Sequence, residues 1–392
     1  MKHTIHIILF FVGCLCAQAQ PAVDEVIRSV ESNNTTLNAI RKQLDARMIE
    51  NRTGIFPHGP DMEYAYFWSE PRAIGPKQNI ALKQSFAFPT VYRQQGRIAN
   101  ARNEQQAAEY QQYRIDILTE ARLVCNELIY TNAMLSEAEK RLGHANTLMR
   151  AYDLMLETGE TNRIEHNKVQ LYQISATRQV KLLTIEQEHL LSELQRLNGG
   201  EPVDFTIAVF SHPALPPDFE EWFAMSADDN PVIAWMAQEK EIREKQVALS
   251  RARNLPGFSA GYVSETLAHE QFHGWAVGIS IPLWENKNRV KLARANVFAM
   301  QEAISDQTLQ LYNQLRSSYQ MAEGLMQTAG EYRIRLEQTG HEALLEKARE
   351  SGEISLITYL QELNHFYQGI DQLLATERDL GRSLAELYRF SQ

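Results

Sequence analysis

The chain has little cysteine, no long basic stretch and, beyond its first residues, no long hydrophobic run. Of its three cysteines, Cys14 and Cys16 lie close to the N-terminus. If the N-terminal segment that contains both is removed, the chain keeps only Cys125 and can form no internal disulfide. The formal charge of −10 and the lack of a basic run exclude a nucleic-acid partner. No apolar run after residue 20 approaches the ~20 residues that a transmembrane helix needs.

The sequence also lacks the motifs that usually mark an active site. It has no G-x-S-x-G motif, no Cys-His signature of an activated nucleophile and no glycine-rich phosphate loop. Two E-x-x-H pairs, Glu186/His189 and Glu362/His365, have a spacing that can hold metal inside a helical bundle. Such a site also needs two further inward glutamates, and these pairs lie at different heights on their helices. We therefore interpret them as solvated helix faces and predict no catalytic residue, no cofactor, no metal site and no enzymatic activity.

The N-terminal residues have the pattern of an export signal. A lysine precedes an apolar run over residues 5–16, and Ala17-Gln18-Ala19 follows as a small-x-small cleavage site. This pattern predicts a signal peptide over residues 1–19 and a mature chain that begins at Gln20. Two alternatives stay open. One is a short membrane anchor, although the run is too short to span a bilayer, and the other is a lipid on Cys14, although the residues before it fit that signal poorly.

The chain contains one arrangement twice. Pro282 follows Pro89 at a separation of 193 residues, and Gly352 follows Gly159 at the same separation. Each proline ends a strand-like run, and each glycine lies in a tetrapeptide of the form Glu-x-Gly-Glu. A shared offset for two features of different kinds indicates an internal duplication. We divide the mature chain into a first repeat, residues 20–199, and a second repeat, residues 200–392, which together form one domain.

Each repeat is predicted to contain a long helical hairpin. No proline interrupts residues 90–201 or 283–392. An apolar heptad, typical of a coiled coil, runs through the first repeat at Ala121, Leu128, Leu135, Leu142, Met149 and Leu156. Glycine suits the left-handed residue that follows a helix terminus, so one long helix is expected to end at the tip in each repeat, the second starting at residue 283. The predicted tips are residues 157–163 and 350–356, and the predicted return helices are 162–197 and 355–390.

Strands are predicted in pairs before each long helix, over residues 61–70, 78–88, 257–266 and 272–283. Their apolar and polar residues alternate over a length that suits transmembrane β-strands. The predicted membrane-interface aromatics are Tyr64, Tyr66, Trp68 and Trp275. Lipid tolerates no open sheet edge, and four strands cannot close a membrane barrel, so the barrel must be shared between chains. Three chains would supply twelve strands, although the pattern alone also permits a dimer or a tetramer.

These features together resemble the TolC-like outer-membrane efflux proteins over essentially all of residues 22–390. The resemblance lies in the strand ends LKQSFAFP and VGISIPLW and in the hairpin tips ETGETNRIEHNKVQ and ESGEISLITYLQEL. It implies a mainly α fold with a small β part: long antiparallel coiled-coil hairpins in two tandem repeats, with four transmembrane strands per chain. A homotrimer would form a 12-stranded β-barrel on an α-helical tube, in the outer membrane of a Gram-negative cell and extending into the periplasm. Helices over 22–54 and 222–254 would complete the tube, and residues 200–226 would form a belt around it.

The resemblance also implies partners and a gate at the hairpin tips. A periplasmic adaptor protein and an inner-membrane pump of the resistance-nodulation-division (RND) class would dock there, and outer-membrane lipid would surround the barrel. The predicted gate and docking residues are Gly159, Glu160, Arg163, Glu165, Gly352, Glu353, Thr358, Gln361 and Glu362. Well-known relatives carry two aspartates where this chain has Thr358 and Gln361, so nearby glutamates are the candidates for a substitute negative ring.

Within that family the phrase QSFAFPTVYRQQ is most similar to the heavy-metal branch, which implies a passive exit duct for metal cations. Ducts for drug efflux or for type I protein secretion share the same architecture and remain an alternative. A soluble periplasmic coiled-coil protein is a second alternative. An adaptor would carry a single hairpin, whereas this chain is predicted to have two.

Overall fold

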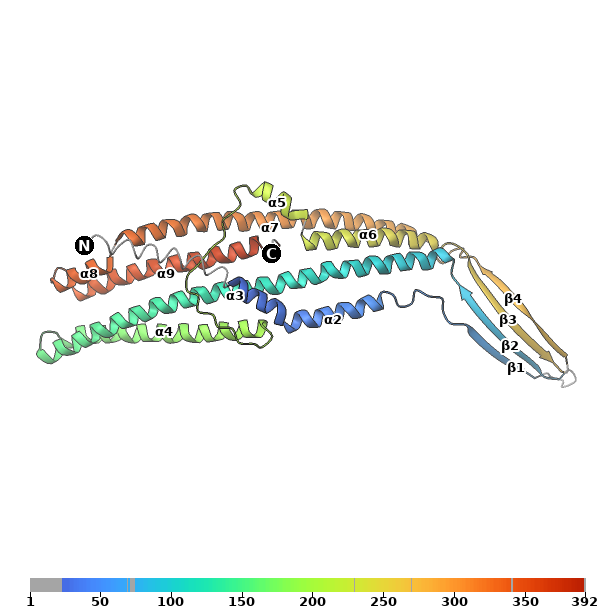
Figure 1. Cartoon of the computed structure of the whole chain (residues 1–392), viewed down its shortest axis with the longest axis horizontal. Coiled ribbons are helices and arrows are strands. Elements are labelled where there is room, and N and C mark those ends of the chain that lie inside the picture. The colour runs from blue at the N-terminus through green and yellow to red at the C-terminus, as the bar shows by residue number, and fades with distance from the viewer. Residues whose placement is uncertain are drawn as a thin grey trace. The chain divides into compact units, whose positions relative to one another are not determined.

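The computed structural model describes residues 23–68, 70, 75–228, 230–268, 270–339 and 341–390 (Figure 1). The predicted signal peptide, its cysteines Cys14 and Cys16 and the predicted mature start at Gln20 lie outside this part. The described chain is mostly helical with one four-stranded antiparallel sheet, which confirms the predicted fold class at the level of one chain. It divides into two compact units. We call residues up to 38, 113–226 and from 311 the hairpin unit, and residues 39–112 and 227–310 the sheet unit.

The first long hairpin consists of α3 (Pro89–Thr158) and α4 (Arg163–Leu197), the cyan and green helices of Figure 1. α3 has 70 residues, which corresponds to about 105 Å at ~1.5 Å per residue. It begins at Pro89. Proline suits the first position of a helix because the N–H groups of the first turn have no partner within the helix, so the N–H that proline lacks is not needed there. The predicted course from Pro89 to the tip is therefore confirmed.

The apolar heptad of α3 faces the interior of the hairpin unit. Ala121, Leu128 and Met149 are buried, and the other three members are half-buried. The neighbouring seam of the same helix is more uniformly buried, at Val124, Ala138, Ala145 and Tyr152. Two adjacent buried seams show that α3 packs against more than one neighbouring helix.

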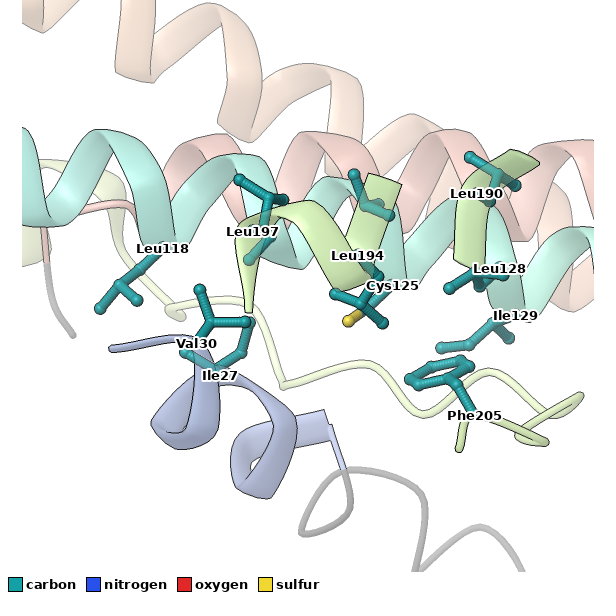
Figure 2. Close-up of a cluster of buried hydrophobic side chains, with 12 residues drawn as sticks. Ile27, Val30, Leu118, Cys125, Leu128, Ile129, Leu190, Leu194, Leu197 and Phe205 are labelled. Carbon is teal, nitrogen blue, oxygen red and sulfur yellow. The ribbon is translucent and has the colours of Figure 1, made fainter. Parts of the chain in front are cut away.

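One buried cluster joins α3 and α4 to the helical segment over residues 23–33 (Figure 2). Its labelled side chains are Ile27, Val30, Leu118, Cys125, Leu128, Ile129, Leu190, Leu194, Leu197 and Phe205. Burying each large aliphatic side chain stabilises the fold by roughly 2 kcal/mol. Burial also raises the pKa of the Cys125 thiol to about 12, so this cysteine stays protonated and packs as an apolar group.

The second long hairpin differs from the prediction at its start. It consists of α7 (Arg289–Thr339), α8 (His341–Glu350) and α9 (Leu356–Leu387), and residue 340 lies outside the described ranges. A helix from residue 283 was expected, but turns occupy 283–288. Asn288 has a φ of +65°, a conformation that ends a right-handed helix and that asparagine tolerates better than most residues. The helix therefore begins only at Arg289.

The two shorter helices that were predicted as single elements are each broken at an asparagine. Residues 23–33 and α2 (Thr35–Glu50) meet at Asn34, which is buried and accepts a 2.8 Å hydrogen bond from the Leu37 N–H. α5 (Phe219–Asp228) and α6 (Pro231–Ala252) replace the helix expected over 222–254. Asn230 caps α6, and Pro231 cannot continue a preceding helix.

The sheet unit contains β1 (Asp61–Phe67), β2 (Lys77–Phe86), β3 (Gly257–Leu267) and β4 (Glu270–Ser280). The four strands pair in sequence order, each antiparallel to the next (Figure 1). β4 ends before the predicted residue 283, because Pro282 has no N–H to donate to the ladder. β1 and β2 also end earlier than predicted, at Phe67 and Phe86 rather than at 70 and 88.

Candidate functional site

The sheet has one apolar face, which we define by its large side chains. These are Met62, Tyr64, Tyr66, Ile80, Leu82, Phe86, Phe258, Tyr262, Trp275, Val277 and Ile279, placed on one side by the strand register. Met62, Leu82, Tyr262 and Trp275, for example, form one continuous cross-strand row. Gln84 interrupts this face, and it becomes polar near the strand turns at Gln78, Ser264, Thr266 and Gln271.

The opposite face, which we call the polar face, carries mostly charged and small side chains. It includes Asp61, Glu63, Lys77, Asn79, Lys83, Ser85, Ser259, Glu265, Gly278 and Ser280, with Phe67 and Phe272 near the turns. Lys77 and Glu265 form a 2.8 Å ion pair across β2 and β3. The strand register therefore places Trp275 and Val277 on the opposite face of the sheet from Lys83 and Ser280.

The apolar face is open in this chain. Trp275 is 85% exposed and Val277 is 88% exposed, and Tyr64 and Tyr66 are exposed as well. Trp68 is also exposed and lies one residue beyond the end of β1. A contiguous apolar surface of this kind marks a contact with lipid or with another protein.

The two hairpin tips have the same hydrogen-bonded turn. Gly159 donates to the Leu156 carbonyl and Glu160 to the Met155 carbonyl, at 3.3 and 2.8 Å. Gly352 and Glu353 repeat this pattern with carbonyls 193 residues further on, at 3.1 and 2.9 Å. This is the Schellman arrangement that ends a helix on a left-handed residue. Both glycines have that conformation, with φ of +78° and +76°, and both lie in open space.

Each return helix begins with a side-chain cap at equivalent positions. The Asn162 side chain accepts hydrogen bonds from the backbone N–H groups of Ile164 and Glu165, and Ser355 accepts one from Thr358. A cap of this kind typically stabilises a helix by ~1 kcal/mol. The duplication thus extends to the hydrogen bonds that turn the chain, and both tips are built by local residues alone.

Most of the predicted gate residues are exposed at these turns. Gly159, Glu160, Arg163, Gly352, Glu353, Thr358 and Gln361 are exposed, whereas Glu165 and Glu362 are half-buried. Glu165 forms a 2.8 Å ion pair with Lys168, on its own helix. Within the described ranges, Glu160, Arg163, Glu353 and Glu362 form no ion pair. The structure of one chain therefore leaves these charges available to another chain or to solvent.

Sequence reasoning missed the contacts that hold the two hairpins together. Arg141 of α3 binds Asp371 of α9 through two hydrogen bonds of 2.7 and 3.2 Å. Its guanidinium also lies over the Tyr367 ring, 4.5 Å from the ring centre. The Arg141 side chain is only 8% exposed, so this pair is well shielded from solvent. We call Arg141, Asp371 and Tyr367 the interhairpin clamp.

A second contact of the same kind lies nearer the tips. The Tyr359 hydroxyl and His144 Nε2 are 2.9 Å apart, and the Arg349 guanidinium lies over the Tyr359 ring. Burial raises the pKa of Tyr359 to about 12, so the hydroxyl stays protonated. The tyrosines were visible in the sequence, but no local pattern pairs them with residues about two hundred positions away.

A buried carboxylate anchors the first segment of the second repeat. Glu377 of α9 accepts a 2.8 Å hydrogen bond from His212 and also pairs with Arg333 of α7. Burial alone would raise the pKa of Glu377, but the hydrogen bonds and charges of His212 and Arg333 outweigh it, so the pKa lies below its ordinary value. This contact fixes part of the predicted belt, residues 200–226, to the helices.

Metal-ligating side chains do not gather in the part of the chain that the structure describes, where no group of three lies together. The pairs Glu186/His189 and Glu362/His365 lie on α4 and α9. Two further candidate metal-ligating side chains, His269 and His273, are four residues apart in the sequence. His273 lies on β4, whereas His269 lies outside the described ranges.

Across the described residues, the helices include none that is both long and apolar enough to span a bilayer.

Neither a protein-family model nor a curated protein matches the sequence. Solved structures do match the fold. The Campylobacter jejuni CmeC outer membrane channel superposes with a TM-score of 0.77 at 13% identity, over 94% of this chain and 85% of that one. The Neisseria gonorrhoeae MtrE outer membrane channel, in its open state, gives 0.75 at 14% identity, over 94% and 88%. CusC, studied for transmembrane channel formation, gives 0.76 at 14% identity, over 94% and 92%.

These matches cover nearly the whole chain and most of each channel. At such low identity they establish the fold, and this chain has the fold of these channels. The fold that the resemblance to TolC-like proteins implied is therefore confirmed.

Proposed function

We propose that this chain is one protomer of an outer-membrane efflux duct in a Gram-negative cell, and that it is not an enzyme. Three copies would close a 12-stranded barrel in the outer membrane, above a helical tube in the periplasm. The duct is passive, and its cargo is moved by a separate pump.

The observation that carries this proposal is the sheet. Its outer strands, β1 and β4, each pair on one edge only within the described residues. Its apolar face is exposed in a single chain, an exposure that soluble proteins avoid. Lipid tolerates neither an open edge nor an unpaired backbone group, so the edges must meet other copies. The fold shared with outer membrane channels supports the same arrangement.

Membrane fractionation and single-channel recording test this function. We expect the mature chain, starting at Gln20, in the outer-membrane fraction, as a trimer that heating in SDS dissociates. Purified trimer should form conducting channels in planar bilayers. A monodisperse monomer that needs no detergent would instead show a soluble periplasmic coiled-coil protein, and a lipid on Cys14 would overturn the predicted cleavage site.

We also propose that the hairpin tips dock a periplasmic adaptor and bring the duct to an inner-membrane RND pump. The proposal is supported by the exposed charges of Glu160, Arg163 and Glu353, which have no ion-pair partner within the described ranges. A photo-crosslinking residue at Arg163 should capture the adaptor in cells, while one at the exposed Glu302 of α7 should not. Equal capture at both positions would contradict docking at the tips.

The cargo is a separate hypothesis. On the resemblance to the heavy-metal branch, we propose metal cations as the cargo. Export of drugs or of polypeptides is the alternative. Deleting the gene and comparing growth in metal salts with growth in lipophilic drugs separates these cargoes. Metal sensitivity alone would support the heavy-metal assignment, and drug sensitivity alone would contradict it.

A further inference from the structure

A cavity in the sheet unit gathers three arginines from three helical elements. It has a volume of about 540 Å³, and Arg102 of α3, Arg253 at the end of α6 and Arg289 at the start of α7 line it. Its other polar lining side chains are Asn51, Thr53, Gln95, Gln246, Ser250 and Asn296, all of which can donate hydrogen bonds. Among the described residues, no carboxylate lines this cavity.

These arginines are not neutralised within the described part of the chain. None of the three forms an ion pair there, and all three are exposed. The chain as a whole carries a formal charge of −10, so an uncompensated positive cluster is unusual for it. Such a cluster attracts anions, and guanidinium groups bind phosphate and carboxylate oxygens in a two-pronged geometry.

The net positive charge lies on one side of the α3–α6 pair. Arg97, Glu104, Glu241, Glu244 and Lys245 line a groove that uses other residues of the same two helices. That groove carries three carboxylates and two basic groups, so it is negative overall, and Lys245 already pairs with Glu241. The contrast shows that the arginines are placed on one side and do not merely follow composition.

The side that carries the arginines continues onto the polar face of the sheet. Arg253 and Arg289 also line a second cavity of about 460 Å³, which reaches Ser85, Gly257 and Ser280. Ser85, Gly257 and Ser280 occupy polar-face positions, whereas Phe86, which also lines this cavity, belongs to the apolar face. Among the described residues, Glu285 is the only carboxylate that lines it. In a duct with lipid on the apolar face, the polar face and the arginine-lined cavity face the interior.

We propose that this cavity is an anion-binding site in the duct interior, where the barrel meets the helices, for small ligands that carry phosphate or carboxylate groups. The interior position rests on the proposed function, but the binding chemistry does not. Three copies of the chain would repeat the site around the channel. A bare metal cation that crosses this level meets repulsion, so the site opposes the heavy-metal hypothesis for the cargo and favours anionic cargo.

Binding of inorganic pyrophosphate to the detergent-solubilised full-length protein tests the site. Isothermal titration calorimetry at low salt should detect binding to the wild type. A triple variant, Arg102→Gln with Arg253→Gln and Arg289→Gln, should bind pyrophosphate at least about tenfold more weakly than the wild type, since several charge-assisted hydrogen bonds are lost together. The matched control changes the same net charge with Arg93→Gln, Arg97→Gln and Arg294→Gln, which line neither arginine cavity. Equal weakening in both triple variants, or no binding to the wild type, would overturn the proposal.

The interior position has its own readout. In planar bilayers under a salt gradient, the reversal potential of the first triple variant should shift toward cation selectivity, and that of the control should not. If the channel conducts but its ion selectivity is the same in the wild type and the first triple variant, the interior position is wrong, and the proposal of a duct still holds. Pyrophosphate binding in a protein that never conducts would overturn the duct and leave the anion site intact.

A lipid headgroup also carries a phosphate group, so a third experiment distinguishes lipid binding from the binding of a free anion. Nanodiscs with phosphatidylglycerol are compared with nanodiscs of phosphatidylcholine alone. The proposal expects equal thermal stability of the wild type in both. Stabilisation by phosphatidylglycerol that depends on the three arginines, without pyrophosphate binding, would show a lipid site and overturn the inference.

Discussion

Gly159 and Gly352 occupy a left-handed conformation that other residues adopt at a cost of ~1–2 kcal/mol, and β-branched residues fit it least. Because a side chain at Gly352 would meet open space, the strain is conformational and not steric. Gly352→Val should therefore weaken export while leaving the trimer on SDS gels. Gly352→Asn is the matched control, since asparagine tolerates the left-handed region. Equal export by the valine and asparagine variants would show that the turn is not functionally sensitive.

Glu377 contributes to stability in a pH-dependent way. Its pKa lies below its ordinary value in the folded chain, so its contribution is complete above the unfolded pKa and is lost as the pH falls through the lower folded value. Glu377→Gln should lower the thermal unfolding temperature at neutral pH, and the difference from wild type should shrink below about pH 4. Glu323→Gln, at an exposed position of α7, should change neither. A difference that stays constant down to about pH 3 would contradict this assignment.

At the scale of the elements, the interhairpin clamp couples α3 to α9. Arg141→Met leaves Asp371 without its shielded partner, and breaking a largely buried pair costs about 2 kcal/mol or more. The double variant Arg141→Met/Asp371→Leu should recover part of that loss, because neither charge then remains. Thermal unfolding of the two single variants and the double variant measures the coupling. Strictly additive effects would show that the two residues do not interact.

The strand register makes a prediction for neighbouring positions of β4. Val277 lies on the apolar face and Ala276 on the polar face. Val277→Arg should reduce barrel assembly at a cost of about 2–4 kcal/mol near the bilayer midplane, since arginine must enter lipid. Ala276→Arg places the same charge in the interior and should assemble far better. The yield of heat-modifiable trimer reports both, and the reverse order would mean that the faces are assigned the wrong way round.

At the scale of the whole molecule, the tips are where the proposed duct closes. Glu353 and Glu362 would face other copies there, and neutralising both should raise the open-channel conductance or reduce cation selectivity in planar bilayers. The control, Glu302→Gln with Glu323→Gln, removes two exposed glutamates away from the tips. Identical recordings from both double variants and the wild type would place the gate elsewhere.

The features that depend on neighbours in the chain were determined by the sequence. The heptad of α3, the glycines at both tips and the alternation in β4 are local patterns, because helix and strand periodicity and left-handed turns arise from a few adjacent residues. The interior breaks were harder to predict. Asn34 accepts a hydrogen bond at the start of α2, and Asn288 has a left-handed conformation before α7, and the apolar pattern records neither.

Tertiary structure alone decided which distant side chains meet. Arg141 binds Asp371 across 230 residues, and His212 reaches Glu377 across 165. The arginine-lined cavity likewise draws its three charges from α3, α6 and α7. The chain sequence records a residue's type and its immediate neighbours, whereas ion pairs and binding cavities depend on which faces of remote helices pack together. The electrostatics of this protein therefore follow from the packing of its helices, even though its elements follow from local pattern.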